Sequence, residues 1–107
     1  PKPGDAERVK QIGKDAFLTE QFNAPSSVFP DSLLADNVEM TQERFFQNAL
    51  VGQDQLRQRV AWTLHKMWVI SAVQIDCAEA IVPYYRLLMR DAFGNYRDLM
   101  RDITLNP

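Results

Sequence analysis

The stretch LRQRVAWTLHKMWVISAV, residues 56–73, decides the fold because its apolar residues recur with the period of a helix. At about 100° per residue, about a third of the helix circumference is apolar. That main face carries Leu56, Val60, Leu64, Met67, Trp68 and Ser71. A second apolar strip, nearly opposite, carries Trp62, Val69 and Val73. A helix that is apolar on two sides packs on two sides, so we expect residues 55–73 to form the central helix of a bundle.

Two arginines lie close to the main face of this helix, Arg57 inside it and Arg59 at its border. A charge among apolar residues has to be paired or hydrogen-bonded, because an isolated buried charge costs several kcal/mol. The candidate partners are carboxylates before and on the last helix: Asp91, Asp98 and Asp102. We predict structural ion pairs with these carboxylates, or hydrogen bonds to carbonyls at a helix C-terminus, and a catalytic grouping of the same residues is the alternative.

The rest of the chain carries helix-capping residues and apolar stripes, whereas alternating strand patterns are absent. The further helices are expected at residues 5–12, 15–22, 41–51, 78–93 and after Asn95. Thr41, Asp54 and Asn95 are the expected N-caps of three helices, and Pro83 is expected to kink its helix or to open a new one. The prolines and serines of residues 24–40 predict a long loop with one turn at residues 32–35. The predicted class is all-α, an irregular bundle of five or six helices around the central one.

Length and charge restrict the function classes. A chain of 107 residues is a single helical region, residues 1–107, with room for one modest core. The net charge of −2, from 12 basic and 14 acidic residues, gives no footprint for nucleic acid. The longest uncharged apolar run, residues 67–73, is far shorter than the ~20 residues that cross a bilayer. We therefore expect neither nucleic-acid binding nor a membrane span.

His65 and Cys77 are the only histidine and the only cysteine. A metal site needs several ligands, and neither residue has a second histidine or cysteine at helical spacing. The sequence thus predicts no metal and no cofactor. Cys77 is expected to be a small buried residue. His65 is a weak functional candidate, because acid–base chemistry would need a carboxylate or nucleophile that only folding brings close.

Several stretches of the chain resemble the bacterial family catalogued as domain of unknown function 1800. The likeness rests on LRQRVA (56–61), the Tyr84–Tyr85 pair that opens a helix, AFGNYRDLMRDITLNP (92–107) and IGKDAFLTEQFNAP (12–25). The resemblance implies that the chain is the N-terminal portion of a longer protein, and so a fragment of a larger domain. It also implies export to the periplasm or the cell exterior, and it carries over no established activity. Where the family often has a small or polar pair, this chain has His65 and Lys66.

Two hypotheses of function follow, from different classes. The first is a structural or interaction region that packs on the rest of its own longer chain, with possible self-association through exposed apolar helix faces. The second is part of a hydrolase-type enzyme that acts on an extracellular polymer. In that alternative Arg57, Arg59, Asp98 and Asp102 line a site that the remainder of the protein completes. A pocket in which these four side chains converge would favour the second hypothesis.

Overall fold

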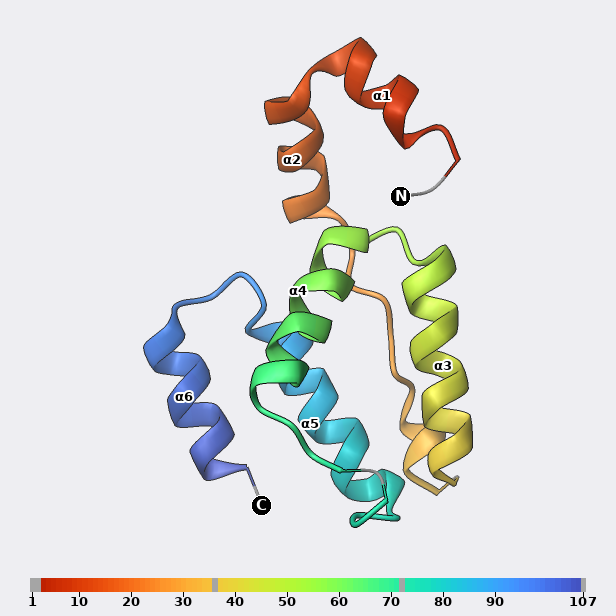
Figure 1. The fold of residues 1–107 in the computed structure, drawn as a ribbon, viewed down its shortest axis with the longest axis vertical. Helices are drawn as coiled ribbons and strands as arrows, with labels where there is room; N and C mark the ends of the chain where they lie inside the picture. Colours follow the sequence, from red (N-terminus) through yellow and green to blue (C-terminus); the bar gives the residue numbers. More distant parts are fainter. Residues whose placement is uncertain (1–2, 36, 72, 107) are drawn as a thin grey trace.

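The computed structural model describes residues 3–35, 37–71 and 73–106 of the chain. Within these residues the chain folds into helices and contains no strand, so the predicted all-α class is confirmed. The elements, in chain order, are α1 (Asp5–Ile12), α2 (Lys14–Asn23), the short 3-10 helix η1 (Asp31–Ala35), α3 (Val38–Val51), α4 (Gln55–Met67), α5 (Ala78–Arg90) and α6 (Tyr96–Leu105) (Figure 1).

Two N-caps show where local chemistry starts a helix. The Asn95 side chain accepts a hydrogen bond of 2.9 Å from the Asp98 amide, so the predicted start of α6 is confirmed. The predicted start of α3 at Thr41 is wrong. Asn37 lies one turn earlier and caps the helix by accepting a 3.0 Å hydrogen bond from the Met40 amide. The loop expected over residues 24–40 is therefore shorter, and the turn expected at residues 32–35 is present as η1.

Helix α4 is shorter than the central helix expected over residues 55–73, because it ends at Met67. The residues that follow include Val69 and Ile70, whose β-branched side chains are less favourable in a helix. The Tyr84 hydroxyl donates to the Trp68 carbonyl, which supplies that carbonyl with a partner outside a helix. The second apolar strip of the expected helix is therefore only partly helical, and Val69 lies exposed beyond the end of α4.

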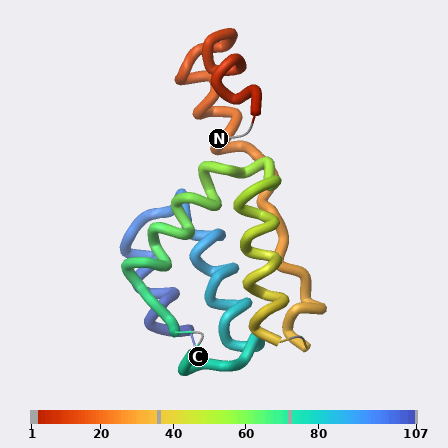
Figure 2. The backbone as a smooth tube through the Cα atoms, turned by 45° about the vertical axis from the view of Figure 1, so that its right-hand side comes forward, coloured from red at the N-terminus to blue at the C-terminus, as the bar shows by residue number. Residues whose placement is uncertain are grey.

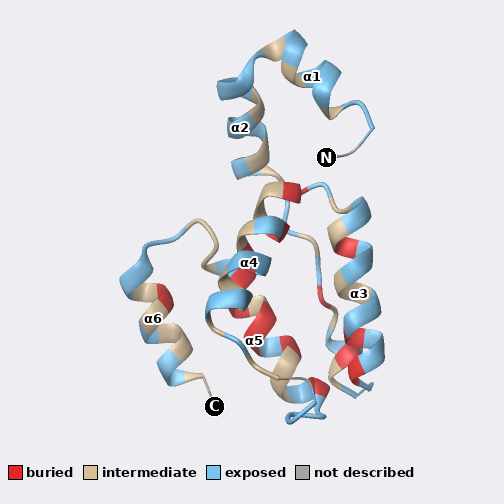
Figure 3. Ribbon diagram, viewed as in Figure 1, coloured by how far each residue is buried: buried red, intermediate tan, exposed pale blue. Residues whose placement is uncertain are grey.

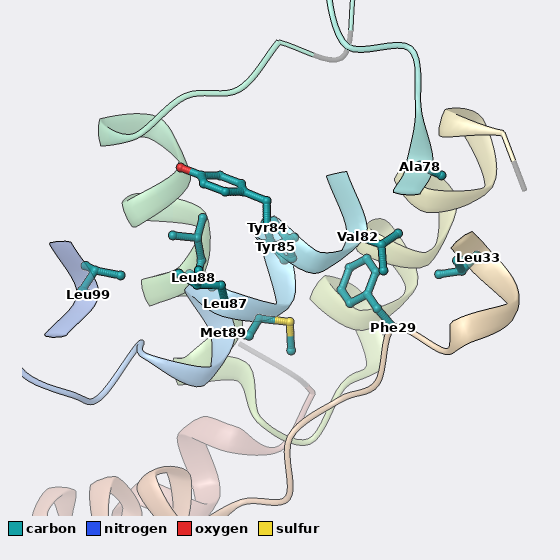
Figure 4. Close-up of a cluster of buried hydrophobic side chains, with 11 residues drawn as sticks. Phe29, Leu33, Ala78, Val82, Tyr84, Tyr85, Leu87, Leu88, Met89 and Leu99 are labelled. Atoms are coloured by element: carbon teal, nitrogen blue, oxygen red, sulfur yellow. The ribbon is translucent and has the colours of Figure 1, made fainter. Parts of the chain in front are cut away.

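The core is built around α5 rather than α4. Helix α5 contacts α3, α4, α6 and η1, and most of its residues between Val82 and Met89 are buried (Figure 3). It is one helix with Pro83 inside it, so the alternative of a new helix opening at Pro83 is wrong. Its predicted end at Phe93 is also too late, because the helix stops at Arg90. The buried apolar cluster consists of Phe29, Leu33, Ala61, Ala78, Val82, Tyr84, Tyr85, Leu87, Leu88, Met89 and Leu99 (Figure 4).

Helices α1 and α2 form an arm that projects from this body (Figure 2). Gly13 joins them with φ of 82°, a conformation that glycine adopts without a Cβ penalty. Arg8 and Glu20 pair across the two helices at 2.7 Å. Neither helix contains a buried residue, so the arm adds little to the core.

Candidate functional site

A cavity of about 350 Å³ lies between α3, α4 and α5, beside Phe29, which precedes η1. We refer to it as the aromatic cavity. Its walls are aromatic and aliphatic side chains with a few polar groups and no charged side chain. They comprise Phe29, Val38, Thr41, Gln42, Phe45, Phe46, Trp62, His65, Ile70, Ile81 and Tyr85. A concave, mostly apolar space with few polar groups is the form that small-molecule sites usually take.

The aromatic rings of this cavity pack in edge-to-face and tilted pairs. Phe45 lies at the centre of the arrangement, 5.4 Å from the Tyr85 ring, 5.1 Å from Trp62 and 5.3 Å from Phe46. Such pairs stabilise the folded state beyond the area they bury, by about 0.5–1.5 kcal/mol each. The walls are therefore held in place by their own contacts, while Phe46 and Trp62 remain exposed at the rim.

His65, the weak functional candidate, is part of the wall of this cavity. Its ring lies 5.8 Å from the Trp62 ring and 6.0 Å from the Tyr85 ring, and its Nδ1 is buried without a hydrogen-bond partner. Burial lowers the pKa of His65 from 6.5, because the charged imidazolium loses solvation. No carboxylate lines the cavity, so the described residues do not supply the acid–base partner that catalysis by this histidine would need.

The Arg57 side chain extends from α4 to the C-terminal end of α5. Hydrogen bonding to carbonyls at a helix C-terminus is one of the two placements expected for it. Its Nη1 donates a 2.9 Å hydrogen bond to the Met89 carbonyl, and its guanidinium lies 4.5 Å from the centre of the Phe93 ring. The same side chain lines a second cavity of about 420 Å³, together with Arg86 and Arg90. Arg86 also donates to the Phe29 carbonyl and pairs with Asp31, so much of the positive charge there is already engaged.

The carboxylates expected to pair with the α4 arginines instead pair with other arginines. Arg90 pairs with Asp91 at 2.8 Å and also with Asp102, which ties α5 to α6. Asp98 pairs with Arg101 along α6, at 3.4 Å.

Arg59 is exposed and lines a third cavity, of about 460 Å³, beside the α1–α2 arm. In the parts of the chain that the structure describes, neither Arg57 nor Arg59 joins an ion pair. Arg57 and Arg59 thus lie on different cavities, and Asp98 and Asp102 line neither of them. The structure does not gather the four side chains of the enzyme alternative into one pocket.

Sequence reasoning missed a buried carboxylate. Asp54 was expected to cap α4, and it does occupy the N-cap position, but its side chain makes no capping hydrogen bond. It is fully buried and accepts hydrogen bonds from the Ser27 amide at 2.9 Å, from the Ser27 hydroxyl and from Gln58 Nε2 at 3.1 Å. A carboxylate removed from water is stable when donors surround it, so this group ties the segment before η1 to α4.

The remaining sequence expectations concern metals, membranes and the cysteine. Among residues 3–35, 37–71 and 73–106, no group of three or more His, Cys, Asp or Glu side chains is placed to hold a metal ion. The helices described are all too short or too polar to cross a bilayer. Cys77, expected to be buried, is exposed at the N-cap position of α5, because the connection that precedes this helix lies on the surface.

Neither the curated proteins nor the solved structures contain a match to this chain. A family model does match it, over residues 1–107, and its description is "Protein of unknown function (DUF1800)". The match spans the tyrosine pair of α5, the arginines of α4 and the whole of α6, which together carry most of the geometry described above. The chain therefore belongs to the DUF1800 family.

Proposed function

We propose that this chain is a helical structural and interaction region of a larger, exported bacterial protein, and that an apolar surface on α3 and α4 is the part that binds. The observation that carries the proposal is the exposure of large apolar side chains next to one another. Phe46, Leu50 and Val51 on α3 are 61%, 73% and 72% exposed. Trp62 on α4 is 41% exposed and joins this surface through the Phe45 ring that lies between them.

Exposed apolar side chains are unfavourable in water when they form one contiguous patch. Removal of apolar surface from water is favourable by about 25 cal/mol per Å², before the entropic cost of association, and soluble monomers rarely expose apolar patches larger than a few hundred Å². Phe46 and Leu50 are four residues apart and so lie on one side of the helix. A covering partner would therefore bury both side chains at once, and we propose that this partner is the remainder of the same longer polypeptide.

A second group of exposed apolar side chains lies at the end of α4 and just beyond it. Met67, Val69 and Val73 are 61%, 67% and 93% exposed. When the covering segment is absent, surfaces of this kind pair with each other, because the same apolar contact is then available only from another copy. Self-association of the 107-residue chain is the consequence that we expect in solution.

The enzyme alternative has less support from the geometry. A hydrolase needs a nucleophile or a general base within hydrogen-bond reach of the reacting group. Arg57, Arg59, Asp98 and Asp102, which were expected to line such a site, are distributed over different cavities and surface ion pairs. We therefore favour the interaction region.

Sedimentation velocity of the 107-residue chain over a range of concentrations tests this proposal. We expect concentration-dependent association, and we expect the double variant Phe46→Gln/Leu50→Gln to shift the population toward the monomer. Leu18→Gln is the control, because Leu18 is an apolar residue, 42% exposed, on the α1–α2 arm and away from this surface. A single monomeric species at every concentration, with a cooperative melt at high temperature, would contradict the proposal.

The proposed export rests on the family resemblance and needs a separate experiment. Fractionation of bacteria that produce the full-length protein is expected to place it in the periplasm or the medium. Its recovery in the cytoplasmic fraction alone would remove export from the proposal and leave the interaction surface unaffected.

A further inference from the structure

Three buried polar atoms without a hydrogen-bond partner belong to residues that line the aromatic cavity. They are the Thr41 hydroxyl oxygen on α3, His65 Nδ1 on α4 and the Tyr85 hydroxyl oxygen on α5. Thr41 is 4% exposed and Tyr85 is 6% exposed, so neither side chain reaches bulk water. Residues from three helices thus carry unsatisfied polar groups in the walls of one cavity.

Unsatisfied buried groups of this kind need an explanation. In folded proteins the large majority of buried side-chain polar atoms have a partner, because leaving one unpaired forfeits its solvation. The neighbouring Tyr84 shows the ordinary solution, since its hydroxyl donates to the Trp68 carbonyl. The Tyr85 hydroxyl, one position further along the same helix, has no such acceptor and its residue lines the aromatic cavity instead.

The lining of the cavity restricts what chemistry would fit. No Asp, Glu, Lys or Arg lines it, so a charged ligand would lose its hydration without gaining a counter-charge. The rings of Phe45, Trp62 and Tyr85 offer faces and edges that pack against another ring. The hydroxyls of Thr41 and Tyr85 each donate and accept, and a neutral imidazole donates at one nitrogen and accepts at the other.

We infer that the aromatic cavity binds a neutral, ring-bearing small molecule that carries a hydroxyl or carbonyl group. The ring packs in the cavity against the walls that include Phe45 and Tyr85, and the polar group bonds to the Thr41 and Tyr85 hydroxyls and to His65. The cavity volume of about 350 Å³ falls within the range of about 300–1,000 Å³ that is usual for small-molecule sites. The proposed ligand site is distinct from the apolar surface on α3 and α4 that the covering partner would bury, although Phe46 and Trp62 border both.

Titration of the 107-residue chain with p-cresol and with toluene, followed by isothermal calorimetry or by NMR shifts, tests the inference. The two probes differ by one hydroxyl group. We expect p-cresol to bind about tenfold more tightly than toluene, as one or two additional hydrogen bonds would give. Binding should also shift the NMR signals of Thr41 and of the Tyr85 ring.

Three variants separate the site from general stability. Tyr85→Phe and Thr41→Val each remove an unpartnered hydroxyl, so we expect them to weaken p-cresol binding toward that of toluene while the melting temperature stays the same or rises. Tyr84→Phe is the matched control on the same helix. It removes a hydroxyl that already has a partner, so it should lower the melting temperature and leave the p-cresol affinity unchanged.

Three results would overturn the inference. One is the absence of saturable p-cresol binding, which would mean that water alone satisfies these groups. Another is equal affinity for p-cresol and toluene. The third is a tighter complex with N-acetyl-tyrosinamide than with p-cresol, which would make a tyrosine side chain of another polypeptide the occupant rather than a small molecule.

Discussion

The Ser27 amide donates a hydrogen bond of 2.9 Å to the carboxylate of Asp54, 27 residues further along the chain. Because the Asp54 carboxylate is fully buried, this contact fixes the extended segment before η1 against the beginning of α4. Gln58, one turn into α4, donates to the same carboxylate oxygen at 3.1 Å. The anionic group is thus the point at which the path from the α1–α2 arm to the body is attached.

Replacement of this carboxylate by an amide is expected to destabilise the fold. Asp54→Asn keeps the shape of the side chain but places an NH₂ group opposite a donor of Ser27 or Gln58. We expect the free energy of unfolding to fall by about 1–3 kcal/mol. Asp15→Asn is the control, because Asp15 is exposed, and it should change stability by under about 0.5 kcal/mol. Urea denaturation of both variants measures the difference, and equal values would contradict the structural role of Asp54.

Gly52 is expected to resist substitution for reasons of space. A Cβ at this position would lie 2.4 Å from the Asn48 carbonyl oxygen and 2.6 Å from the Ser27 hydroxyl oxygen. Its φ of −52° is one that alanine also adopts, so backbone conformation is not the obstacle. We expect Gly52→Ala to cost about 1–3 kcal/mol, measured by thermal unfolding. At Gly94 the nearest atom would be 3.3 Å away, so Gly94→Ala should cost clearly less, and the reverse order would count against this packing.

The two arginines of α4 are expected to differ in their contribution to stability. Arg57→Met removes the hydrogen bond to the Met89 carbonyl and the stacking of the guanidinium on Phe93. We expect a loss of about 1–3 kcal/mol in the free energy of unfolding. Arg59→Met, on the exposed side of the same helix, should change it by under about 0.5 kcal/mol. If both substitutions change the free energy of unfolding by only a few tenths of a kcal/mol, then Arg57 does not anchor α4 to the end of α5.

His65 gives the stability a dependence on pH. Burial holds the pKa of the folded His65 below 6.5, so below that pH the unfolded chain binds more protons than the folded one. The stabilisation is therefore complete above about pH 7.5 and is lost as the pH falls through 6.5 toward the folded pKa. We expect the stability of the wild type, relative to that of His65→Gln, to decrease between about pH 7.5 and about pH 5. Parallel stability curves for the two proteins would exclude this role.

Local signals were read correctly from the sequence where a single side chain determines the outcome. Asn95 caps α6 through its own side chain, and the described residues form six α-helices that overlap the ranges expected from the sequence. The end of α4 could not be read in this way, because the Trp68 carbonyl is engaged by the distant Tyr84. On α6, Leu99 and Ile103 pack against the core, whereas Tyr96 at the start of the helix is 57% exposed.

The aromatic cavity was beyond sequence reasoning for a related reason. Its unpartnered groups come from Thr41, His65 and Tyr85, which lie on three helices. Thr41 resembled a helix cap, and Tyr85 stood out only as part of the tyrosine pair of the family resemblance. Only the packing of α3 and α4 on α5 brings these side chains together, and periodicity along one helix contains no information about which residues of another helix it will meet.

The α1–α2 arm has a consequence for how the molecule opens. Its helices have 8 and 10 residues, lengths at which an isolated helix is marginal in water, and neither holds a buried side chain. The arm keeps its helical order through its attachment, chiefly the Gln21 side chain at the start of α4 and the Phe22 ring against Phe93. Hydrogen exchange should therefore divide the chain into two cooperative units, with the amides of the arm exchanging through a low-energy opening that leaves the α5-centred body closed. Beyond the Arg8–Glu20 pair that joins them, the lifetime of these two helices depends on the contacts at the base of the arm.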